Sequence, residues 1–163
     1  MKTRVLFAAS IAAVLLSGAA VAGPGHKPGE GHAHADDTAY GKPGDPKKPA
    51  RIVQVVMRES DGKMLFLPDQ LRVRKGEQIR FQLRNNGEID HEFVIGTVAE
   101  NQKHMKEMEK NPDMEHDDPN SKRLKPKAKG EIVWQFTKTG TFEFACLIPG
   151  HYQSGMVGAI VVE

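Results

Sequence analysis

A chain of 163 residues is long enough for one domain of ordinary size with tails. It carries 23 Lys and Arg against 21 Asp and Glu, and this even balance argues against a nucleic-acid partner, which would call for a basic stripe. The single cysteine excludes an internal disulfide.

The first 22 residues have the pattern of a signal peptide. A positively charged start precedes a short apolar run at residues 5–16, and Ala-Val-Ala at residues 20–22 is a small-residue cleavage site. The apolar run is too short to span a bilayer comfortably, and no cysteine near the cleavage site offers a lipid anchor. We therefore expect a protein exported to the periplasm, with no membrane span after processing. Loss of Lys2 and Arg4 would leave 21 basic and 21 acidic residues, a net charge of zero.

Residues 23–50 form a leader rich in Gly, Pro, His, Lys and Asp. This composition buries too little apolar surface to offset the entropy of ordering, so the leader is predicted to be disordered. Its histidines, His26, His32 and His34, fit either a weak metal collector or a solubilising linker that happens to contain histidine. Both interpretations stay open.

From residue 51 the pattern becomes that of β-strands. A β-branched run at residues 52–57 ends at the Asp61-Gly62 turn signal, and residues 64–67 form a short strand that stops before Pro68. Leu71 and Val73 are expected in a transition segment. Apolar and polar residues then alternate over residues 78–85, which predicts a strand with one buried face.

His91 opens the next predicted strand, residues 91–95, after a turn at residues 85–87. A histidine at a strand end is ordinarily a polar residue at the rim of a core. Apart from His151, however, the other five histidines all lie in the leader or in the insertion described next. His91 is thus the only further imidazole on the β framework.

Residues 97–128 break the β pattern and are predicted to be an insertion that is partly helical, with a helix over residues 100–110. The insertion carries three methionines and two histidines, and thioether and imidazole are both ligand types for copper. They make a candidate second, labile copper site: His104, Met105, Met108, Met114 and His116. The alternative, slightly favoured, is that Met105 and Met108 pack onto the sheet while the histidines remain in water.

The last third of the chain returns to strands, at residues 130–136, 141–146 and 158–162. In the second of these, alternation places Phe142, Phe144 and Cys146 on one apolar face. Seven or eight short strands joined by turn signals predict an all-β protein, a β-sandwich.

A loop of three soft or nitrogen ligands follows, Cys146, His151 and Met156, with four residues in each gap. Pro149-Gly150 is a turn signal that folds the loop back and lets these side chains converge. Thiolate, imidazole and thioether suit copper, and a weak methionine bond is typical of electron-transfer sites. Taken singly, the cysteine would be interpreted as a small buried residue, the histidine as a surface residue and the methionine as part of the core. Together, in this order around a turn, they favour a metal site.

This Cys-x4-His-x4-Met loop, between a Phe-rich strand and a short terminal strand, resembles the ligand loop of the cupredoxins. The similarity covers residues 51–163. With its signal peptide, His-rich leader and Met/His insertion, the chain looks most like the small periplasmic cupredoxins associated with copper tolerance. The resemblance implies a Greek-key sandwich or barrel and one type 1 copper held by His91, Cys146, His151 and Met156.

At one position the chain departs from that family pattern. Many cupredoxins carry an asparagine directly after the first histidine ligand, where it forms a hydrogen bond across to the cysteine loop. Here the residue is Glu92. We expect Asn85 or Asn86 to be the candidates that take over this link.

Two functions fit such a site. The first is the binding and handling of periplasmic copper for copper tolerance, with a one-electron step as an addition. The second is a soluble electron carrier between respiratory or photosynthetic partners such as a c-type cytochrome, which would expose an apolar patch from Leu147, Ile148, Pro149 and Tyr152. An enzyme is not expected, because copper oxidases and nitrite reductases need further copper centres, for which this chain lacks clustered histidines on its β framework.

Overall fold

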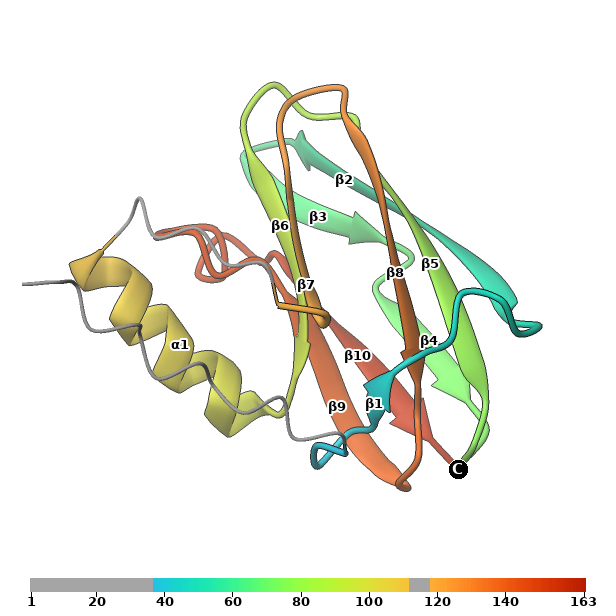
Figure 1. Cartoon of the computed structure of the whole chain (residues 1–163). Helices are drawn as coiled ribbons and strands as arrows, with labels where there is room; N and C mark the ends of the chain where they lie inside the picture. Colours follow the sequence, from blue (N-terminus) through green and yellow to red (C-terminus); the bar gives the residue numbers. More distant parts are fainter. Residues whose placement is uncertain (1–36, 112–117) are drawn as a thin grey trace, which may run out of the picture. The chain divides into compact units, whose positions relative to one another are not determined.

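The computed structural model describes residues 37–111 and 118–163, and there two five-stranded sheets pack face to face beside one helix (Figure 1). The first sheet has the spatial order β1 (Lys42–Pro43), β8 (Lys129–Gln135), β5 (Gln78–Asn85), β2 (Arg51–Ser60), β3 (Lys63–Leu67). The second has the order β4 (Gln70–Val73), β10 (Val157–Val162), β9 (Gly140–Ala145), β6 (His91–Gly96), β7 (Ser121–Leu124). Neighbours are antiparallel except for the parallel pairs β2–β5 and β4–β10. The predicted all-β sandwich is confirmed.

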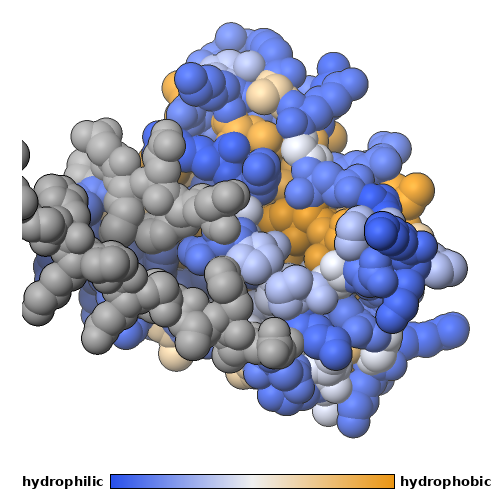
Figure 2. Space-filling model, in the orientation of Figure 1, coloured by the Kyte–Doolittle hydropathy of each residue, from blue (hydrophilic) through white to orange (hydrophobic). Residues whose placement is uncertain are grey.

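The alternation read in the sequence produces the core between the sheets. In β5, Ile79, Phe81 and Leu83 are buried while Gln82 and Arg84 are exposed. The centre of the core is aromatic, with ring centroids 5.0 to 5.1 Å apart in the pairs Phe93–Phe144, Phe66–Phe144 and Phe81–Phe93. Among the coloured residues on the face drawn in Figure 2, most are hydrophilic, and hydrophobic ones gather in a central area.

Helix α1 (Val98–Lys110) covers the outer side of the second sheet, next to β6 and β9 (Figure 1). It begins at Thr97, whose hydroxyl accepts from the N–H of Glu100 while the Glu100 carboxylate accepts from the N–H of Thr97, a capping box. Because the helix lies on one side and the core on the other, all six residues of β6 are buried. The strand that carries His91 is therefore held from both faces.

Three strands were not predicted: β1, β4 and β7. Strands β4 and β7 each have four residues and lie at an edge of the second sheet. Each contains an exposed basic residue, Arg72 in β4 and Lys122 in β7, and such short charged strands show little apolar–polar alternation in the sequence. β4 replaces the expected transition segment by pairing with β10. β7 lies inside residues 97–128, so the chain leaves the sheet for α1 and rejoins it earlier than expected.

Residues 37–50, expected in the disordered leader, have a defined place in the fold. Tyr40 is buried and its ring stacks on Trp134 with centroids 5.4 Å apart, while β1 pairs with β8. One large aromatic residue, Tyr40, thus supplies this polar stretch with an apolar contact to the core. The rest of the leader with its histidines, and the expected signal peptide, lie outside the described residues.

Among the described residues, no helix has both the length and the apolar character needed to cross a membrane.

Candidate metal centre

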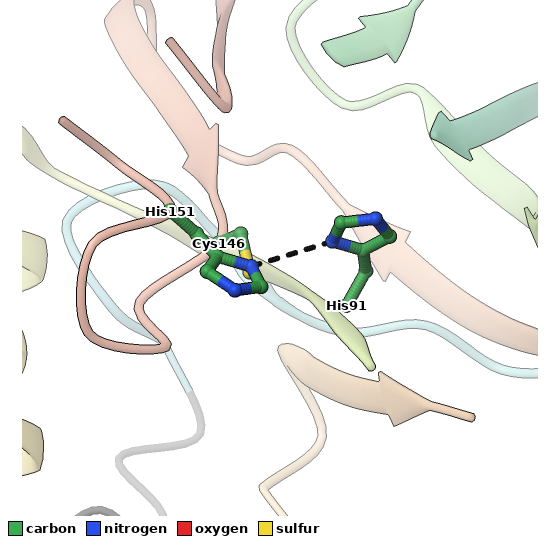
Figure 3. Close-up of side chains that lie close together, drawn as sticks. All are labelled: His91, Cys146 and His151. Carbon is green, nitrogen blue, oxygen red and sulfur yellow. Dashed lines mark hydrogen bonds between the residues drawn. The ribbon is translucent and has the colours of Figure 1, made fainter. Parts of the chain in front are cut away.

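Three potential ligand atoms, one each from His91, Cys146 and His151, lie within 4.8 Å of one another, and all three residues are buried (Figure 3). His91 is the first residue of β6, and Cys146 directly follows β9. His151 lies in the loop between β9 and β10. The site thus sits where two neighbouring strands of the second sheet meet one loop.

Backbone hydrogen bonds fold this loop back on itself. The N–H of His151 donates to the carbonyl of Ile148, and the N–H of Met156 donates to the carbonyl of His151. The N–H of Cys146 donates to the carbonyl of Met156, which brings the two ends of the loop together. Gly150 has φ of 87°, a left-handed conformation that glycine adopts without strain, so the Pro-Gly turn acts as the sequence predicted.

The distances between these ligand atoms are compatible with binding of one ion. Nδ1 of His151 lies 3.3 Å from Cys146 Sγ and 3.4 Å from His91 Nδ1, which is long for a hydrogen bond between two ring nitrogens. Two nitrogen ligands about 2.1 Å from a shared ion, at 120° to each other, would lie about 3.6 Å apart. The donor set, a sulfur and two imidazole nitrogens, therefore fits a small soft cation.

The environment of Cys146 is apolar, as the strand parity predicted. Cys146 and Phe144 both belong to the main core, and the cysteine is completely buried. Burial raises the pKa of the Cys146 thiol to about 12, against the opposing effect of the Glu92 and Ile148 N–H groups. A metal cation is thus needed to hold this group as the thiolate at neutral pH.

His151 is suited to ligation in its neutral form. Burial and the neighbouring His91 lower the pKa of the His151 imidazole. At neutral pH the ring is uncharged and keeps a lone pair for a metal.

Met156 closes the loop and is fully buried in the core with Cys146. Its backbone is tied to both Cys146 and His151. The thioether is therefore part of the same buried end of the sandwich as the three clustered residues.

The residue after His91 contacts Cys146 through its backbone. The backbone N–H of Glu92 donates to Cys146 Sγ at 3.2 Å, so β6 contacts the sulfur directly. Asn85 does not take this role, since its amide donates to the carbonyls of Ile89 and Leu124. It fixes the turn before β6 instead.

One residue of the site was missed by sequence reasoning. Glu59 of β2 places Oε1 2.7 Å from Nε2 of His91, 32 positions further along the chain. Burial acts to raise the pKa of Glu59, but hydrogen bonds from its own backbone, from Glu88 and from His91 outweigh this and lower it. No local motif predicts this contact, because it depends on long-range packing: β2 pairs with β5 as far as Met57 and Asn85, just before the turn that leads to His91.

Of the candidate second site, the structure describes His104, Met105 and Met108. Met108 is buried, and Met105 packs on the cluster of Val94, Ala145 and Leu147. His104 is half-buried, and Met114 and His116 lie outside the described residues. Within the described ranges, the only group of three or more His, Cys, Asp or Glu ligands is the one at Cys146.

The apolar patch expected around His151 is smaller than predicted. Leu147 is fully buried beneath α1 and is not available at the surface, because the helix covers this side of the sheet. Pro149 is exposed, and Ile148 and Tyr152 are half-buried.

Comparison with known proteins identifies the family. Residues 53–163 match the model described as copper binding proteins, plastocyanin/azurin family. This chain belongs to that family. It is 50% identical over 168 residues, covering all of both chains, to the copper-resistant cuproprotein CopI of Rubrivivax gelatinosus. It is 36% identical to CopI of Pseudomonas aeruginosa, covering 92% of this chain and 91% of that protein.

Solved structures agree on the fold. The reduced auracyanin of Roseiflexus castenholzii superposes with a TM-score of 0.58, covering 71% of this chain and 99% of that one at 21% identity. The predicted resemblance to the cupredoxins is thus confirmed. Membership of a copper-binding family and a His/Cys/His set beside a buried methionine together support a type 1 copper as the cofactor.

Proposed function

We propose that this protein binds one copper ion in the periplasm and contributes to copper tolerance. The ligands in this proposal are the thiolate of Cys146, the imidazoles of His91 and His151, and a weak axial thioether from Met156. The convergence of three ligand atoms within 4.8 Å carries the proposal. Two relatives of this chain are described as copper-resistant cuproproteins, and one of them matches it over its full length. These matches support the role in copper tolerance.

The donor chemistry favours copper over zinc. Zinc accepts cysteine and histidine, but methionine is not among its usual ligands. A trigonal Cys-His-His set with a distant thioether suits copper in both oxidation states. Because β6 is buried on both sides and the loop is closed by backbone hydrogen bonds, the ligands would move little between those states. Small rearrangement favours fast one-electron exchange.

The protein in this proposal has no catalytic centre of its own. Its partners are the copper ion and a periplasmic redox or copper-handling protein. Export rests on the signal peptide expected at residues 1–22.

Growth of a deletion strain tests this function. The strain should become sensitive to copper while respiring normally, and the wild-type gene should restore growth whereas Cys146→Ser should not. Gln102→Ala, a change at an exposed position of α1, is the matched control and should restore growth fully. Normal growth in copper with impaired respiration would contradict the tolerance role and support an electron carrier.

A further inference from the structure

The Glu59 carboxylate contacts His91 on the ring nitrogen that does not face the other ligands. Nε2 of His91 lies 2.7 Å from Glu59 Oε1, whereas Nδ1 lies 3.4 Å from Nδ1 of His151 (Figure 3 shows the Nδ1 side). The His91 ring is fully buried, and the Glu59 side chain is about a third exposed. A neutral imidazole has one N–H, and a carboxylate 2.7 Å from Nε2 requires the proton to be there. Nδ1 then keeps its lone pair on the metal side.

The carboxylate is held by the backbone as well as by His91. Its second oxygen, Oε2, accepts from the N–H of Glu88 at 3.0 Å. Gly87 makes room for it, since a Cβ at this position would lie 2.5 Å from both carboxylate oxygens. The Gly87 N–H donates in turn to Asn85, so the turn that receives the carboxylate is itself fixed. The turn before β6 thus binds the Glu59 carboxylate of β2 in a defined position.

We propose that Glu59 is a positioning residue of the copper centre, which holds His91 in the Nε2–H tautomer and lowers the reduction potential of the bound copper. This inference rests on His91 being a ligand, as proposed above. A negative charge one imidazole ring away from the ion stabilises Cu(II) more than Cu(I), because the oxidised ion carries the larger charge. A charged acceptor also makes the ligating nitrogen a stronger donor.

Glu59→Gln tests the charge, since it retains an oxygen acceptor of the same size. The copper-loaded variant should keep an intense thiolate-to-copper band, and its preference for Cu(II) over Cu(I) should fall about tenfold. For a one-electron couple this corresponds to a rise of about 59 mV in reduction potential, measured by voltammetry. Gly87→Ala, which displaces the carboxylate without changing charge, should shift the potential in the same direction.

Glu77→Gln is the matched control, with the same chemical change at another partly exposed, paired glutamate. Its partner Arg51 is eight positions from Glu59 along β2, roughly 26 Å at 3.3 Å per residue. At that distance salt screens the charge, so the potential should not move.

A second measurement needs no copper. Nitrogen-15 NMR of the metal-free protein should find His91 with its proton on Nε2 and protected from exchange with water, and Glu59→Leu should remove that protection. A proton on Nδ1 in the wild type would overturn the inference, as would a Glu59→Gln potential equal to that of Glu77→Gln. Absence of the charge-transfer band from the wild-type protein would instead overturn the proposed copper site itself.

Discussion

At the scale of single residues, the Met156 thioether is the one proposed ligand that carries no charge and no imidazole. Replacing it with leucine preserves volume in the core, so the protein should fold with a loss below about 1.5 kcal/mol. The thiolate band should remain, because it arises from Cys146, while the reduction potential should rise, because Cu(II) loses a donor. Met108→Leu, the same change at a buried methionine of α1, should leave the potential unchanged. Equal potentials for the two variants would contradict an axial role for Met156.

Glu77 provides a pH-dependent contribution to stability far from the metal. The hydrogen bond from Arg51, opposed in part by burial, lowers the pKa of Glu77 in the folded protein. A carboxyl with a lowered folded pKa stabilises the protein above its unfolded pKa of about 4.3, and the contribution is lost as pH falls through the folded value. Because Arg51 and Glu77 are partly exposed, this is worth at most about 1 kcal/mol. The free energies of urea unfolding of the wild type and of Glu77→Gln should differ at neutral pH and become equal below the folded pKa of Glu77. A difference that stays constant with pH would contradict this contribution of Glu77.

At the scale of elements, α1 is joined to the sheet and to the metal loop through a buried carboxylate. Asn101 donates to Glu143 of β9 at 3.1 Å, and the hydroxyl of Tyr152, next to His151, donates to the other oxygen at 3.3 Å. Asn101→Ala would leave buried Glu143 short of a donor, which should cost about 1 to 3 kcal/mol in the free energy of unfolding. Gln102→Ala on the exposed side of the helix should stay within about 0.5 kcal/mol. Equal losses would show that the buried contact adds nothing.

The elements also show how far the sequence carries a prediction. Strand β5 lies where alternation placed it, and the Cys-His-Met loop converges as its spacing indicated, because both signals are local. Edge strands β4 and β7 were not predicted, because they are strands through their pairing with β10 and β6 and not through an alternation in their own sequence. The burial of Leu147 and the contact of Glu59 with His91 depend on how distant elements pack, which no short pattern records.

At the scale of the whole molecule, Tyr40 connects both sheets at the start of the described chain. Its ring stacks on Trp134 of β8, and its ring centroid lies 6.1 Å from that of Phe142 in β9. Its hydroxyl oxygen accepts a hydrogen bond from the Asn120 amide. A protein that begins at residue 51 should therefore lose about 3 to 5 kcal/mol of unfolding free energy, and Tyr40→Ala should lose a similar amount. A protein that begins at residue 37 should keep the full value. No difference between the two shortened proteins in chemical denaturation would contradict a structural role for residues 37–50.

The site itself depends on the two sheets bringing His91 of β6 to the loop that follows β9. Titration of the metal-free protein with Cu(II), followed by visible absorption, tests this most directly. An intense thiolate-to-copper band should grow to saturation at one equivalent, and it should be absent from Cys146→Ser and strongly altered in His91→Gln. Copper binding without such a band, or a band that survives in Cys146→Ser, would contradict the account.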